Sequence, residues 1–119
     1  MKEKIIYLET EDRNYPLCFN LNVMEEIQEK YGSISKWGEI VENKVDGKEP
    51  NVKDLKQGLM IMINEGIDIE NEKATIKSEF LNSKQVGRLI SRVGFTKVLN
   101  QIKEVTINST KTDDTPKNV

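Results

Sequence analysis

Two neighbouring segments near the C-terminus carry apolar residues at helical spacing, and this pattern most restricts the folds open to the chain. Apolar residues recur at positions i, i+3, i+4 and i+7 of the segment 86–93, and the same period resumes over 95–105. Ser83 can open the first of these helices. Gly94 separates the two and is expected to act as a C-cap or a kink. The C-terminal third is therefore predicted to be helical.

A further helix is predicted from Val52 to Glu65, with Asn51 as its N-cap. Its second half is apolar nearly all round, which is typical of a central, buried helix. We expect Gly66 to end it. Residues 67–76 fit either a loop or a short strand.

The N-terminal part begins with two short β-forming runs, Lys2 to Leu8 and Tyr15 to Phe19, around a polar break at residues 11–14. They predict a β-hairpin over roughly residues 3–20. Asn22 and Gly32 are expected to cap the two ends of a first helix.

Ser33 can cap a second helix, which contains Trp37, and residues 43–50 read as a polar loop. The predicted fold is therefore α+β and mainly helical: an N-terminal β-hairpin packed on a bundle of four to five helices. Residues 1–107 are expected to form this single domain, and residues 108–119 a disordered polar tail.

The types of residue present restrict the chemistry of the chain. It has no histidine and one cysteine, Cys18. A Ser-His-Asp or Cys-His arrangement is therefore impossible, and no zinc site of the usual kind can be built within one chain. The seven glycines are scattered, so no phosphate-binding loop is expected. We predict a protein that is not an enzyme and uses no cofactor or metal.

Location is inferred from two further features. A lone cysteine suits a reducing compartment, and no apolar run is long enough for a signal peptide or a membrane span. The expected location is the cytoplasm, without contact to a membrane.

Charge is distributed unevenly along the chain. Residues 1–50 carry seven Lys/Arg and eleven Asp/Glu, whereas residues 84–103 carry five Lys/Arg and no acid. Lys84, Arg88 and Arg92 are spaced i, i+4, i+8 and should line one helical face. This stripe is either a solvated face or a docking surface for an acidic partner, such as the acidic N-terminal half of another copy. Nucleic acid is the less favoured partner because the helix–glycine–helix segment fails the helix-turn-helix pattern.

Trp37, the only tryptophan, also has two interpretations. Its place on an apolar helical face favours core packing. The alternative is an anchor for a partner protein, since tryptophan is enriched at interface hot spots.

Two stretches resemble the tail assembly chaperones of siphophages and prophages of Gram-positive bacteria. The first is YPLCFNLNVMEEIQEKYGSISKW, in which a short β segment leads into a helix closing with Tyr31 and Gly32. The second is FLNSKQVGRLISRVGFTKVLNQI, a capped helix, a glycine and another amphipathic helix. The similarity spans roughly residues 3–107 and consists of core and capping positions.

The resemblance implies a non-enzymatic helper that binds the tape measure protein, the tail tube protein or both before the tail polymerises. Members of the family are absent from the finished virion. Two alternatives stay open: a structural tail or head–tail connector protein retained in the particle, and a small nucleic-acid-binding regulator. A chaperone of this kind needs an exposed apolar groove for helical clients and no catalytic group.

Overall fold

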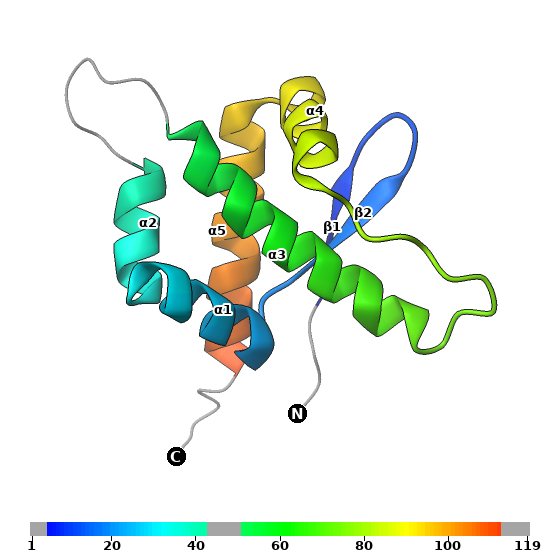
Figure 1. The fold of residues 1–119 in the computed structure, drawn as a ribbon, viewed down its shortest axis with the longest axis horizontal. Helices are drawn as coiled ribbons and strands as arrows, with labels where there is room; N and C mark the ends of the chain where they lie inside the picture. The colour runs from blue at the N-terminus through cyan, green and yellow to red at the C-terminus, as the bar shows by residue number, and fades with distance from the viewer. Residues whose placement is uncertain (1–4, 43–50, 113–119) are drawn as a thin grey trace.

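The computed structural model describes residues 5–42 and 51–112, with side chains described as far as residue 107. A two-stranded hairpin is followed by five helices, which confirms the predicted α+β fold (Figure 1). The elements are β1 (Ile5–Glu9), β2 (Asn14–Cys18), α1 (Leu21–Tyr31), α2 (Ile34–Glu42), α3 (Val52–Asn71), α4 (Ser83–Val93) and α5 (Phe95–Thr112). The loop expected at residues 43–50 lies outside the described residues.

The strands β1 and β2 pair antiparallel, with Ile5 opposite Cys18 and Glu9 opposite Asn14. Thr10 fixes the turn between them. Its hydroxyl donates to the carbonyl oxygen of Arg13 at 2.7 Å and accepts from the backbone N–H groups of Asp12 and Arg13. This bonding fixes the backbone of the turn.

Helix caps follow the sequence closely, with one correction. Asn20, and not Asn22, is the N-cap of α1, because its side chain accepts from the N–H of Val23. Gly32 ends the helix at φ 93°, a left-handed conformation that favours glycine. Ser33 then caps α2 by accepting from the N–H of Lys36 at 2.9 Å.

The helix α3 crosses the molecule diagonally and packs against α1, α2, α4 and β2 (Figure 1). Asn51 caps it as predicted, but Gly66 does not end it, and the helix continues to Asn71. Gly66 is needed for packing: a Cβ there would lie 2.8 Å from Cβ of Pro16, so the glycine lets β2 approach the helix backbone. Residues 67–71, expected as loop or strand, belong to α3.

Residues 72–82 run back along α3 without helix or strand structure. Two asparagines on α3 hold this segment. Asn71 bonds both the N–H and the carbonyl of Ser78 at 2.9 Å. Asn64 does the same for Leu81, at 2.9 Å to the N–H and 3.1 Å to the carbonyl. The segment leads into α4 through a capping box made by Asn82 and Gln85.

Gly94 separates α4 from α5 at φ 105°, as the sequence predicts for a C-cap. The backbone of α5 is helical as far as Thr112. Residues 108–112, expected to be part of a disordered tail, are thus in the helix, and residues 113–119 lie outside the described residues. The prediction overlooked this extension because polar residues can continue a helix whose preceding turns are packed.

Candidate functional site

An apolar groove of about 310 Å³ runs between α2 and α5. We call it the α2/α5 groove. Its lining residues are Ile34, Trp37, Gly38, Val41, Glu42, Leu99, Ile102, Lys103, Thr106 and Ile107. An ion pair of 2.9 Å between Lys103 Nζ and Glu42 Oε2 joins the two helices. Ile107 is 50% exposed, so the groove offers apolar surface to a partner.

Gly38 lies in the wall of this groove, inside α2. A Cβ placed on it would meet no described atom within 4 Å. Gly58 and Gly66, by contrast, are each needed where another side chain approaches the helix. Glycine inside a helix costs about 0.5–1 kcal/mol relative to alanine. No contact in the described chain offsets that cost at Gly38, and the glycine leaves the groove open at its middle.

Trp37 lies beneath the groove and is 4% exposed. Its indole N–H donates to the backbone carbonyl of Asp54 at 3.1 Å, and its ring packs on Gly58 of α3. The tryptophan therefore belongs to the core, as the favoured interpretation predicts. It contributes to the groove as part of the floor and does not project as an anchor.

Asp54 also accepts a hydrogen bond of 2.5 Å from the hydroxyl of Tyr31, which ties α1 to α3. Burial and this bond to a carboxylate raise the pKa of Tyr31 above its ordinary value of 10.0. An unfolded chain would ionise the phenol near pH 10, whereas the folded chain keeps its proton. The contribution to stability is thus complete below pH 10 and is lost as the pH rises above it.

We therefore expect the free energy of unfolding to fall with rising pH above about 10, and to fall less steeply in Tyr31→Phe. Denaturant titrations at several pH values would measure both slopes. Tyr7 remains as an internal reference, because its hydrogen bond to Glu70 also raises the pKa of its phenol. Equal slopes for the two proteins would contradict the assigned role of Tyr31.

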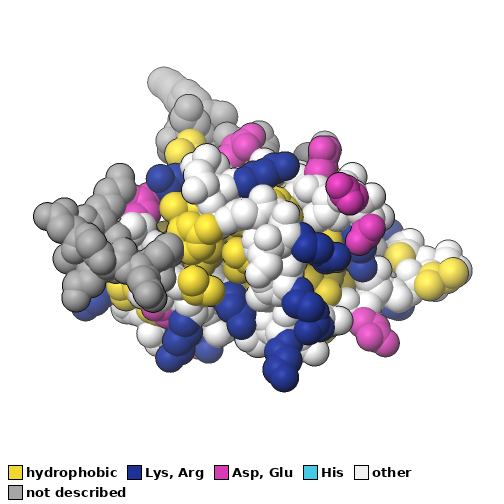
Figure 2. All heavy atoms as spheres, turned by 90° about the horizontal axis from the view of Figure 1, so that it is seen from above, with side chains coloured by type: hydrophobic (Ala, Val, Ile, Leu, Met, Phe, Trp, Pro, Cys, Tyr) yellow, Lys and Arg dark blue, Asp and Glu magenta, His cyan; other side chains and the backbone are white. Residues whose placement is uncertain are grey.

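The predicted basic stripe lies on the exposed face of α4. Lys84, Arg88 and Arg92 are all exposed. Seen from above, the molecule shows many Lys and Arg side chains through its centre and lower edge, with several acidic side chains toward the upper right (Figure 2). Arg92 pairs with Asp12 of the hairpin turn at 3.3 Å, and these side chains are 54% and 73% exposed. A pair this exposed contributes at most about 1 kcal/mol.

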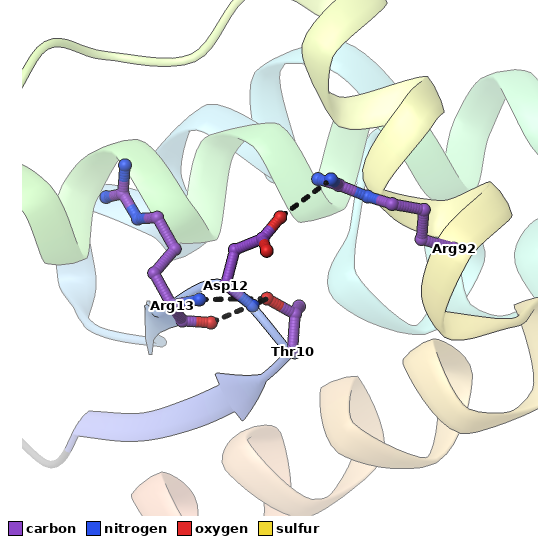
Figure 3. Close-up of polar contacts among 4 residues, drawn as sticks. All are labelled: Thr10, Asp12, Arg13 and Arg92. Carbon is purple, nitrogen blue, oxygen red and sulfur yellow. Dashed lines mark hydrogen bonds and ion pairs between the residues drawn. The ribbon is translucent and has the colours of Figure 1, made fainter.

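Beside this stripe α4 and the hairpin enclose a hollow of about 490 Å³. We call it the arginine hollow. Its lining residues are Arg13, Tyr15, Leu81, Gln85, Arg88, Ser91 and Arg92. The guanidinium carbon of Arg13 lies 4.5 Å from the ring centroid of Tyr15. Figure 3 shows Arg13 and Arg92 on either side of Asp12, which points toward Arg92. Lys84 does not line the hollow, so the structure separates it from the two arginines of the stripe.

Two further findings concern chemistry and membranes. Among residues 5–42 and 51–112, no three His, Cys, Asp or Glu side chains come together as metal ligands could. Within the same ranges, no helix combines the length and the apolar character needed to cross a bilayer. Cys18 is buried in β2.

Several residues of these surfaces were not foreseen from the sequence. Arg13 lines the same hollow as Arg88 only because the hairpin packs on α3 and α5 and so lies next to α4, and a sequence shows no such approach. Gly38 is visible in the sequence as a glycine within an apolar helix, but open space beside it is not. The one available signal was in α5, where Leu99 and Ile107 widen the apolar stripe beyond the face that the core needs.

Comparisons with protein-family models, curated proteins and solved structures found no match. The α2/α5 groove and the arginine hollow are the candidate sites. The first is lined mainly by apolar side chains, and the second contains three arginines.

Proposed function

We propose that the chain is a tail assembly chaperone that binds helical segments of a phage tail protein, the tape measure protein foremost, in the α2/α5 groove. One observation carries the proposal: an apolar groove between two helices, with a glycine in its wall at which an added Cβ would meet no described atom. A helix seats well in such a groove, since its backbone can approach closely where the facing residue has no Cβ.

The dimensions of the groove indicate how much client it could hold. The helix α2 has nine residues, which corresponds to a length of about 13 Å. A client helix lying along it would contribute two to three turns, with apolar residues at i, i+3, i+4 and i+7. Tape measure proteins are long and helical, so they offer many such segments. A groove this short is expected to bind each client helix weakly and reversibly, as a chaperone that leaves before assembly is complete requires.

Filling the groove at Gly38 tests the proposal. In Gly38→Trp, the indole would occupy the space that a client side chain needs, and we expect at least about tenfold weaker binding, or 1.4 kcal/mol. Binding would be measured by calorimetry with a recombinant fragment of the tape measure protein encoded in the same genome. Ser35→Trp is the matched control, because Ser35 is exposed on the same helix and does not line the groove.

Equal weakening by both variants, or by neither, would show that the groove is not the client site. A second measurement addresses assembly. Mass spectrometry of purified particles should not detect a transient chaperone. Stoichiometric presence of the chain in virions would instead support a structural tail or connector protein.

A further inference from the structure

The second surface of the molecule is set by the hairpin turn. Hydrogen bonds to Thr10 fix the turn, and the guanidinium of Arg13 stacks on Tyr15 with 4.5 Å to the ring centroid. Arg13 lines the arginine hollow from this side. Arg88 and Arg92 reach the same hollow from α4, where they lie one turn apart. Three arginines from the hairpin turn and from α4 thus line one space, together with Leu81 and the largely buried ring of Tyr15.

The positive charge in this hollow is mostly unneutralised. Arg92 has Asp12 within 3.3 Å. Among the described residues, no acidic side chain forms an ion pair with Arg13 or Arg88. A guanidinium keeps its charge at all ordinary pH values and binds carboxylates through two parallel hydrogen bonds. Charge complementarity therefore points to an anionic occupant.

The surroundings of the hollow favour a protein over a nucleic acid. Arg92 also borders a second hollow of about 540 Å³, whose other lining residues include Glu9, Glu11 and Asp12. A phosphate backbone continuing past Arg92 would meet these three carboxylates. A short peptide can place its acids on the arginines and end there. We infer that the arginine hollow binds an acidic segment of a partner protein, in which carboxylates flank an apolar side chain that contacts Tyr15 and Leu81.

Asp12 competes with such a segment for Arg92. The carboxylate of Asp12 occupies one hydrogen-bonding edge of the guanidinium, and the ligand displaces it or shares the group. Because the pair is exposed, displacement costs little. Removing the charge of Asp12 should therefore strengthen binding, whereas removing the charge of an arginine should weaken it.

The test uses a fluorescein-labelled peptide with two glutamates on each side of a leucine, and a control peptide with glutamines in their place. Fluorescence anisotropy at low ionic strength would measure binding to the full chain. Arg88→Glu is expected to weaken binding of the acidic peptide by about tenfold or more. Lys84→Glu, the same charge change on the same helix but outside the hollow, should weaken it by less than about threefold. Asp12→Asn should tighten binding by about threefold.

The inference is overturned if the acidic peptide does not bind or if the glutamine peptide binds equally well. It is also overturned if Lys84→Glu and Arg88→Glu weaken binding equally, or if Asp12→Asn weakens it. The hollow would instead be assigned to nucleic acid if a single-stranded DNA of the same length bound more tightly than the peptide and if Arg88→Glu abolished that binding. Arg88 is exposed, so circular dichroism of the variant should match the parent. The hollow and the α2/α5 groove share no residue, so Arg88→Glu should leave tape measure binding in the groove unchanged.

Discussion

Trp37→Ala is expected to lower the free energy of unfolding by about 3–5 kcal/mol, the largest loss from any single substitution considered. The indole is 4% exposed, fills the space between α2 and α3, and bonds the carbonyl of Asp54. Alanine would leave a cavity and remove the hydrogen bond that the indole donates to α3. Because the chain has one tryptophan, unfolding should be followed by far-UV circular dichroism and not by fluorescence.

The same experiment separates the two interpretations of this residue. A core tryptophan reduces stability when it is removed, whereas an interface anchor reduces partner binding and leaves the midpoint of unfolding in place. A loss below about 1 kcal/mol would contradict the core assignment. Val41→Ala, at a neighbouring buried position with a smaller side chain, should give a smaller loss and serves as the comparison.

Gly58→Ala is expected to lower the free energy of unfolding by about 2–3 kcal/mol, although alanine is the better helix former. The added Cβ would lie 2.1 Å from Cζ2 of Trp37, and the indole cannot swing aside without breaking its bond to Asp54. The side chain and the helix must therefore both shift. Denaturant unfolding of the two proteins measures the difference.

Gly38→Ala is the matched control, since it is the same change in a helix where the Cβ meets no described atom. It should raise the free energy of unfolding by about 0.4–1 kcal/mol. The key expectation is that the two substitutions change the free energy of unfolding in opposite directions.

In addition, Trp37→Leu should partly relieve the Gly58→Ala clash, with a coupling energy of about 1 kcal/mol in the double variant. Strict additivity would mean that the two residues do not touch.

Local signals in the sequence predicted the hairpin, the helices and most of their ends. Gly32 and Gly94 end helices because the chain there takes a positive φ, which depends on neighbouring residues alone. Gly66 looks the same in the sequence but has a different purpose: it lets Pro16 approach α3. A sequence does not distinguish a glycine that ends a helix from one that admits another strand. That choice depends on contacts between distant residues.

The candidate surfaces could likewise be predicted from the sequence only in part. Helical spacing was enough to place Arg88 and Arg92 on one face. The contribution of Arg13 depended on how the hairpin packs on α3 and α5, and the groove at Gly38 depended on the separation of α2 and α5. Periodicity describes the faces of one element, whereas a hollow is formed by two elements meeting.

The asparagines of α3 have a consequence for how this protein can change over evolution. Each amide recognises only main-chain atoms of the passing segment, so it is indifferent to the identity of the side chains there. Ile76 lies in the short loop that the Asn71–Ser78 hydrogen bonds close, and its side chain is 86% exposed. Substitutions and short insertions near Ile76 should leave α3 and α4 undisturbed. Residues 72–82 are therefore the segment in which related proteins could differ most without loss of stability.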